Sequence, residues 1–336
     1  MTLDPQKIKT IGVFVEKELM GEGLLKLPFL KALRYEFPQA HITWIVGVEK
    51  SVYSSYLKPL TFGLIDNIIE NLFSNNMSWK YLFFKNDLPK ISFDMIINTE
   101  NNLKKTLILK KIPHKYFICS LHGFLYSTIK NNNISYKKSP HLTTKLIDLV
   151  DIIVQERKER DSFVIITPKK FLETVSIFFP ASKKYIGLAP GAGDIRKCWS
   201  LDNFMDIASI YRQKGYIPVW ILGPKETSVY QDLRKTFPED LFPLQENELF
   251  LESPFYTIAI AKHLKVALSN DSGTGHLLGA ANIPIISLFG HTRAEKVHPF
   301  SPLVHCIKSQ DLGSTNINHI PKDLVAKKLD QILSHL

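Results

Sequence analysis

The chain has 336 residues, of which 45% are hydrophobic and 22% are charged, with 16 Gly and 19 Pro. These proportions are those of an ordinary soluble globular protein, and they exclude collagen, intrinsic disorder and a disulfide scaffold. The length predicts two domains, since one domain usually takes about 100 to 200 residues. No run approaches the roughly 18 uncharged apolar residues of a membrane span, and residues 1–9 lack a secretory apolar core, so we expect a cytoplasmic protein.

Charge and cysteine content exclude fewer functions than the overall composition does. Lys and Arg number 42 against 32 Asp and Glu, which gives a net charge of +10. Such a surplus favours nucleic acid, anionic membrane or phosphorylated substrates, but it also serves plain solubility. Cys119, Cys198 and Cys306 are odd in number and too far apart for a metal-binding pair, so we expect reduced packing residues.

The first half is expected to alternate strands and helices. Residues 10–15 form a short apolar run typical of a buried strand, residues 24–37 have the spacing of an amphipathic helix, and Pro38 ends that helix. Residues 41–46 predict a second strand, parallel to the first. Further strands are predicted at 65–69, 93–97 and 116–119, helices at 79–84, 103–109, 142–155 and 168–179, and polar loops at 131–133 and 135–140.

The second half repeats this alternation. Strands are predicted at 185–189, 217–222, 266–269 and 284–289, and helices at 201–214, 226–237, 255–263 and 275–281. The pattern indicates an α/β fold with a doubly wound parallel sheet in each domain, and ligands bind such sheets at the carboxyl ends of the strands. We expect an N-terminal domain at 1–180, a C-terminal domain at 181–320, a cleft between them, and an amphipathic helix at 321–336 that packs back on the first domain.

The segment N-D-S-G-T-G-H at 270–276 connects a predicted strand to a predicted helix. Its glycines let backbone amides approach a ligand and a helix N-terminus favours negative charge, so the segment suits a diphosphate. The candidate donor-binding residues here are Asp271, Ser272, Gly273, Thr274, Gly275 and His276. The structural alternative is a capped turn with Asp271 or Ser272 as N-cap. The segment matches neither GxGxxG nor the P-loop pattern, which disfavours NAD and P-loop sites.

Two other strand-to-helix loops carry candidate contacts. In the loop 190–199, Gly191 precedes the adjacent cations Arg196 and Lys197, which are suited to phosphate oxygens. The alternative for that loop is a solvated basic segment. Glu226, after Gly223, is suited to a ribose diol, or it is simply a carboxylate that the helix dipole favours.

The first half offers one candidate for proton chemistry. Gly21-Glu22-Gly23 places a carboxylate between glycines, where it can act as a general base; the alternative is an ordinary acid at a helix start. Five lysines make this half locally basic, unless they only form a solvated helix face. They are Lys104, Lys105, Lys110, Lys111 and Lys115. No His, Cys or carboxylate set has metal-ligand spacing, so we expect a site without metal.

These motifs together resemble those of the glycosyltransferase family that contains the ADP-heptose:lipopolysaccharide heptosyltransferases. The most specific stretch begins at Asp271 and continues through Ala281 and Pro284 to Gly290. Further matches are Pro190-Gly-Ala with Lys197 and Trp199, Leu222-Gly with Glu226, Gly21-Glu22, Leu27-Pro28, Leu33-Arg34 and Phe37-Pro38. The resemblance covers nearly the whole chain and is weakest over residues 60–167.

The resemblance implies a GT-B fold, in which two Rossmann-like domains face a cleft, and an inverting transfer without metal. The first domain would mainly hold the acceptor and the second the nucleotide sugar. Carried over by position, Lys197 would hold the diphosphate, Glu226 the ribose, Asp271 with Ser272, Gly273 and His276 the phosphates and sugar, and Glu22 would be the base. The family usually has Asp where this chain has Glu22, and the extra methylene moves the carboxylate by about a bond length.

We therefore expect a cytoplasmic glycosyltransferase, peripheral on the inner membrane face, that moves heptose from ADP-heptose onto a lipopolysaccharide core or a related glycan. The expected partners are the nucleotide sugar, a phosphorylated lipid-linked acceptor and an anionic membrane surface, without nucleic acid or a cofactor. Two alternatives remain: a non-catalytic nucleotide-sugar or glycan-binding protein of the same fold, and another GT-B enzyme such as a nucleotide-sugar epimerase.

Overall fold

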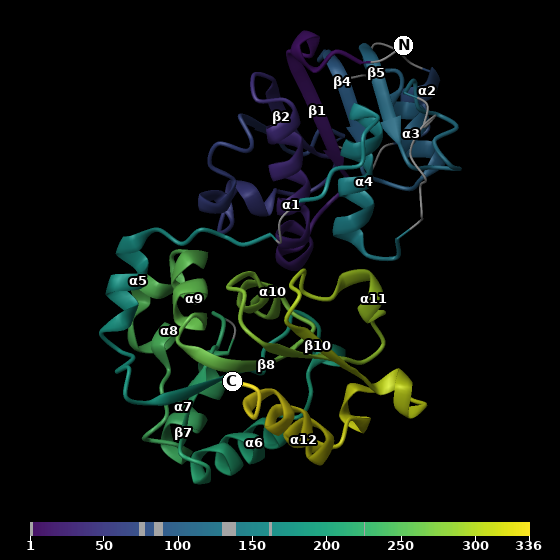
Figure 1. Ribbon diagram of the computed structural model, residues 1–336. Helices are drawn as coiled ribbons and strands as arrows, with labels where there is room; N and C mark the ends of the chain where they lie inside the picture. Colours follow the sequence, from purple (N-terminus) through teal and green to yellow (C-terminus); the bar gives the residue numbers. More distant parts are fainter. Residues whose placement is uncertain (1–2, 74–77, 84–89, 130–138, 161–162, 225) are drawn as a thin grey trace. The chain divides into compact units, whose positions relative to one another are not determined.

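The computed structural model describes residues 3–73, 78–83, 90–129, 139–160, 163–224 and 226–336. The chain divides into two compact units, residues 1–161 and residues 162–336 (Figure 1). This boundary corrects the expected one at 180, because α5 (Lys169–Ser176) packs in the second unit. There the ring of Phe171 lies 5.1 Å from that of Phe255 and 4.7 Å from that of Tyr256, centroid to centroid.

Unit 1 is built on a five-stranded sheet whose described strands are all parallel, in the order β3-β2-β1-β4-β5. The strands are β1 (Thr10–Val15), β2 (His41–Val46), β3 (Asn67–Ile69), β4 (Phe93–Asn98) and β5 (His114–Cys119). The helices are α1 (Met20–Glu36), α2 (Lys80–Phe83), α3 (Leu103–Leu109) and α4 (Leu142–Val154). Residues 23–30 of α1 are all buried, since this helix packs on α4 as well as on the rest of the unit.

Unit 2 has a second parallel sheet of five strands, in the order β10-β9-β8-β6-β7. The strands are β6 (Lys184–Ala189), β7 (Tyr216–Trp220), β8 (Leu264–Asn270), β9 (Ile285–Phe289) and β10 (Val304–Lys308). Besides α5, the helices are α6 (Leu201–Gln213), α7 (Thr227–Thr236), α8 (Pro243–Glu246), α9 (Pro254–Ala261), α10 (Gly273–Ala280), α11 (Ala294–Val297) and α12 (Lys322–Leu333).

The last helix, α12, belongs to the core of unit 2. Its buried residues Val325, Leu329 and Ile332 join one hydrophobic cluster with side chains of α6 and of the sheet. The hydroxyl of Tyr211 donates hydrogen bonds to the Ala326 carbonyl and to an Asp330 carboxylate oxygen, each over 2.9 Å. The prediction that this helix packs back on the first domain is corrected, because its apolar face is used within its own unit.

The two sheets differ in where the strand order reverses. In unit 1 the chain starts at β1, builds outward to β2 and β3, and returns to β4 on the other side of β1. In unit 2 it starts at β6, pairs with β7, and returns to β8 on the other side of β6. Ligands of open parallel sheets bind beyond the carboxyl ends of the strands at this reversal. The fold therefore directs attention to the loops after β6 and β8, and after β1 and β4.

Most predicted elements are present, with their ends shifted by a few residues. The strand expected to reach 222 ends at Trp220, and β3 keeps only three of the five residues expected. The edge strand β10 was not predicted. The predicted loop residues 131–133 and 135–138 lie outside the described residues. Among the described helices, none has the length and apolar character that crossing a bilayer requires.

Candidate functional site

The reversal point of unit 2 carries an ion pair between two predicted site residues. Lys197 lies in the loop after β6, and Asp271 follows β8 directly. The Lys197 ammonium is 2.7 Å from an Asp271 carboxylate oxygen, and the two side chains are 28% and 5% exposed. The buried carboxylate thus holds a partly exposed cation at the end of the sheet, where an anion can approach it.

Asn270 fastens these two loops to each other. Its buried side-chain amide donates to the Pro190 carbonyl over 2.6 Å, and its side-chain oxygen accepts from the Trp199 amide over 3.1 Å. Both partners lie in the loop that carries Lys197. Because all these groups are removed from water, the two bonds fix the loop's path. Sequence reasoning gave Asn270 no role, although a polar residue at the end of an apolar strand is a signal that could have been followed.

The N-terminus of α10 has the form that the glycine-rich motif predicts. Ser272 is the N-cap, and its hydroxyl accepts from the Gly275 amide over 3.2 Å. A Cβ at Gly275 would lie 2.6 Å from the Ser269 hydroxyl and 3.0 Å from the Asn270 carbonyl, so only glycine fits. Gly273 and Thr274 are half-buried in the first turn, and His276 is buried. The segment is therefore both a capped turn and an end that leaves backbone amides for an anion.

Glu226 lies against two glycines from different loops. A Cβ on Gly191 would lie 2.6 Å from one Glu226 carboxylate oxygen, and a Cβ on Gly223 would lie 2.7 Å from the other. Glu226 itself stands at the N-cap position of α7 but makes no side-chain cap. Its side chain is thus half-buried beside the two glycines that follow β6 and β7. The sequence motif includes Gly223, but it does not predict the contact of Gly223 with Glu226.

Arg196 differs from its neighbour Lys197. Its guanidinium forks onto Asp194, with Nε and Nη2 donating to that carboxylate over 3.1 and 2.7 Å, and its side chain is 74% exposed. The hydrogen bonds from Arg196 lower the pKa of Asp194 to about 2, and the charge of nearby His291 contributes. Burial raises the pKa of the Cys198 thiol, and the charges of Glu226 and Asp194 add to that rise. Arg196 is therefore already paired with a carboxylate.

In unit 1, Glu22 lies in the first turn of α1 and is half-buried. The helix begins at Met20, so the glycine-flanked segment is helical rather than the loop that we expected. At the reversal point of this unit, Lys105 pairs with Glu16 and lies 3.9 Å from Glu100. The Glu16 amide donates to Glu100 over 3.0 Å. The one ammonium at this sheet end is thus already flanked by two carboxylates.

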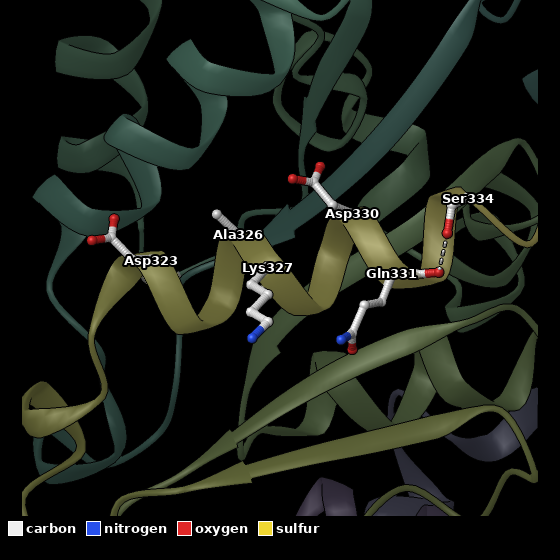
Figure 2. Close-up of a pocket in the computed structure, with 6 residues that line it drawn as sticks. All are labelled: Asp323, Ala326, Lys327, Asp330, Gln331 and Ser334. Atoms are coloured by element: carbon white, nitrogen blue, oxygen red, sulfur yellow. Dashed lines mark hydrogen bonds between the residues drawn. The ribbon is translucent and has the colours of Figure 1, made fainter.

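Two further features of the described chain concern possible ligand sites. Within the described part of the chain, no three His, Cys, Asp or Glu side chains are arranged to hold a metal ion. A surface hollow of about 560 Å³ runs along α12, and Figure 2 shows that its lining side chains come from that helix and from its C-cap residue, Ser334. They are Asp323, Ala326, Lys327, Asp330, Gln331 and Ser334. None of the predicted site residues lines it.

The sequence profile of glycosyltransferase family 9 (heptosyltransferase) matches residues 82–324, which is more than half of the chain. The chain belongs to glycosyltransferase family 9. This family 9 enzyme is similar to lipopolysaccharide heptosyltransferase 3 of Escherichia coli K12, with 22% identity over 291 residues that cover 81% of this chain and 80% of the relative. It is also similar to lipooligosaccharide heptosyltransferase 2 of Haemophilus influenzae, with 23% identity over 221 residues, or 62% and 64% of the two chains.

Solved structures agree with this family 9 assignment at the level of the fold. A glycosyltransferase family 9 structure from Veillonella parvula superposes with a TM-score of 0.70 at 18% identity, over 100% of this chain and 99% of that one. The E. coli heptosyltransferase WaaC with ADP superposes with a TM-score of 0.65 at 14% identity, over 96% and 99%. The predicted family, the predicted GT-B class of two Rossmann-like parallel-sheet domains and the predicted glycosyltransferase activity are confirmed.

Proposed function

We propose that this family 9 glycosyltransferase transfers heptose from ADP-heptose to the core of a lipopolysaccharide or a related glycan, with inversion and without a metal. Support for the donor comes from the ADP in the WaaC structure and from a second WaaC structure with ADP-2-deoxy-2-fluoro heptose. Support for the acceptor class comes from the names of the similar enzymes. Within this chain, the observation that carries the proposal is the Lys197–Asp271 pair beside the N-terminus of α10.

The proposed reaction is a single in-line displacement at the anomeric carbon of the donor sugar. The acceptor oxygen forms the new bond as the bond to the diphosphate oxygen breaks, and Glu22 accepts the acceptor's hydroxyl proton. Negative charge grows on the departing diphosphate, toward which Lys197 and the amides of Gly273 and Thr274 are proposed to point; the amides of Gly275 and His276 donate to Ser272. Fixed donors of this kind contribute about 3 to 4 kcal/mol each in other enzymes, so the charge can be stabilised without a metal.

The donor side can be tested without knowing the acceptor. Thermal unfolding would be followed with ADP, UDP and GDP, because a ligand at 100 times its Kd stabilises a protein by about 2.7 kcal/mol. We expect ADP to raise the melting temperature most, and Lys197→Ala to abolish that shift. An equal or larger shift with UDP would contradict the proposed donor.

Glu22→Gln separates an enzyme from a binding protein. The variant is expected to keep the ADP-induced thermal shift and to lose most of its transfer of labelled sugar from ADP-heptose to purified lipopolysaccharide core. A wild type that binds ADP-heptose but transfers nothing would favour the non-catalytic alternative. A wild type that converts the nucleotide sugar without an acceptor would favour an epimerase.

We also propose that unit 1 contacts an anionic membrane through a surface made of Trp79, Phe83, Leu103 and Lys104. The three apolar side chains are 54%, 77% and 40% exposed, and the Lys104 ammonium lies 5.7 Å from the Trp79 ring centroid. Among the described residues, Lys104 forms no ion pair with a carboxylate. Exposed aromatic rings beside cations suit the lipid interface, where each cation contributes about 1 kcal/mol.

Vesicle sedimentation tests this surface. Binding to vesicles of phosphatidylcholine with phosphatidylglycerol is expected, and it should weaken with salt and in the variant Trp79→Ala/Lys104→Glu. Phe62→Ala is the matched control, because Phe62 is 94% exposed in the same unit but outside this surface. Equal binding to phosphatidylcholine alone, or equal loss in the control, would contradict the proposal.

A further inference from the structure

An ion pair between two residues that the proposed mechanism does not use is buried at the start of α1. The Glu18 and Lys26 side chains are 0% and 6% exposed, and the Lys26 ammonium lies 3.7 Å from one Glu18 carboxylate oxygen. Glu18 precedes α1, and Lys26 lies two turns into it. The pair therefore joins the segment that enters the helix to the helix itself.

Glu18 is fixed by its other oxygen. That oxygen accepts from the indole nitrogen of Trp44, in β2, over 3.0 Å and from the Ser51 hydroxyl over 2.7 Å. The Ser51 hydroxyl in turn accepts from the Tyr53 amide over 3.1 Å. Burial raises the pKa of Tyr53 well above its usual value, and the charge of Glu18 adds to that rise.

The same group of residues holds α1 at a second point. The Tyr53 hydroxyl donates to the Gly23 carbonyl over 2.6 Å. Gly23 follows Glu22 directly, and Lys26 is four residues after Glu22, on the same side of the helix one turn later. Glu22 therefore lies on the turn that Tyr53 and Lys26 both hold.

The Thr143 hydroxyl also donates to the Leu25 carbonyl over 2.7 Å, but the N-cap residue does not fix this end of the helix. Its N-cap is Leu19, which makes no side-chain cap and is 68% exposed. A buried ion pair is also a poor source of stability, since apolar side chains of similar size often serve as well or better. The pair is thus better explained by what it positions than by the stability it supplies.

We propose that Glu18 and Lys26 are positioning residues that fix the first turn of α1 and, through it, the Glu22 carboxylate. The inference rests on the proposed role of Glu22 as the base. Trp44 and Ser51 fix the Glu18 carboxylate by hydrogen bonds, and the ion pair with Lys26 connects that carboxylate to the helix. The extra methylene of Glu22 gives its carboxylate more freedom than an Asp would have, and a firmly held helix turn restricts that freedom.

The decisive variant is Glu18→Gln/Lys26→Met, which removes both charges and keeps an oxygen for Trp44 and Ser51. Each single variant leaves one buried charge without a partner and should lower both the melting temperature and the transfer rate. The double variant should recover the melting temperature, with kcat still about tenfold below wild type and the KM for the donor and the ADP-induced thermal shift unchanged. Recovery of kcat together with the melting temperature would overturn the inference.

Unit 2 supplies a matched control. Asp240 is buried, accepts from the Trp220 indole nitrogen over 2.8 Å and pairs over 2.5 Å with Arg212, whose side chain is 35% exposed, so a buried carboxylate is again held by an indole and a cation far from Glu22 in the sequence. Asp240→Asn/Arg212→Met should leave kcat unchanged at temperatures where it is folded. An equal fall of kcat in this control would show a general effect of removing buried pairs and would overturn the positioning role.

Tyr53→Phe keeps the test possible if the double variant does not fold. It removes one hydroxyl and should lower kcat severalfold while donor KM stays unchanged; an unchanged kcat would count against the inference.

Glu22→Gln, assayed in parallel, separates the proposed base role of Glu22 from the proposed positioning role of Glu18 and Lys26. If Glu22→Gln is inactive but Glu18→Gln/Lys26→Met has wild-type kcat, only the positioning role fails. If Glu22→Gln is fully active, the base assignment itself fails.

Discussion

The two units end their central strands in different ways. After β1 and β4, Lys105 is 12% exposed and is enclosed between Glu16 and Glu100, so the one cation of that sheet end already faces two carboxylates. After β6 and β8, Lys197 is 28% exposed, its carboxylate partner is buried behind it, and glycines and a helix N-terminus lie beside it. The cation at the end of the first sheet is thus already enclosed by carboxylates, whereas the cation at the end of the second sheet is accessible to an anion. This difference supports placing the nucleotide on unit 2.

The largest expected effect is that of removing the accessible ammonium of Lys197. Lys197→Ala should lower the transfer rate by about a hundredfold or more, because a fixed donor facing the developing charge is lost. Lys105→Ala should leave ADP affinity unchanged, since that ammonium is enclosed by its own carboxylates. Steady-state rates and ADP titrations of both variants measure this difference. Equal losses of rate and ADP affinity in the two variants would show that the two sheet ends do not differ in function.

A smaller effect is expected from Gly191→Ala. The new Cβ would collide with the Glu226 carboxylate, which is the end of a flexible side chain, so the carboxylate moves and the fold survives. We expect about a tenfold weaker affinity for ADP, equivalent to about 1.4 kcal/mol, with little change in melting temperature. Gly193→Ala is the control, because a Cβ there meets nothing within 4 Å. If both variants bind ADP as the wild type does, Glu226 is not a donor contact.

The cap of α10 should matter for stability. Ser272→Ala removes the acceptor for the Gly275 amide and should cost about 1 kcal/mol of unfolding free energy. Chemical denaturation of Ser272→Ala and of Ser182→Ala, at an exposed serine, measures this. A bound nucleotide should mask part of the loss if its phosphate takes over the freed amide.

The smallest effect is expected from Arg196→Ala. Hydrogen bonds from Arg196 lower the pKa of Asp194 to about 2, so the carboxylate is charged and the pair is present above that pH and is lost only as the pH falls toward it. A donor phosphate must compete with Asp194 throughout the neutral and mildly acidic range. The affinity of Arg196→Ala for ADP should be only slightly lower than that of the wild type, and the ratio of the two affinities should be the same at each pH in that range. A loss as large as that of Lys197→Ala would mean that the donor displaces Asp194.

Local patterns predicted the sheets well, because apolar strand runs and amphipathic helices depend mainly on neighbouring residues. They failed for β10, whose residues are mostly half-buried and resemble a loop, and for the unit boundary, which depends on aromatic contacts of Phe171 with residues more than 80 positions later. The residues of the candidate site in unit 2 could be selected from the sequence, because they sit in loops after predicted strands, and their role in binding stays a prediction. The Asn270 bonds and the Glu18–Lys26 pair join distant segments, and no local pattern indicates such partners.

The position of Glu226 between Gly191 and Gly223 has a practical consequence for redesign. Any side chain added at either glycine pushes on the same carboxylate, so neither position offers room for changes to the proposed nucleotide site. Ile195, which is 82% exposed in the same loop as Gly191, is free of that constraint. A library intended to change nucleotide preference should therefore vary Ile195 and leave both glycines intact.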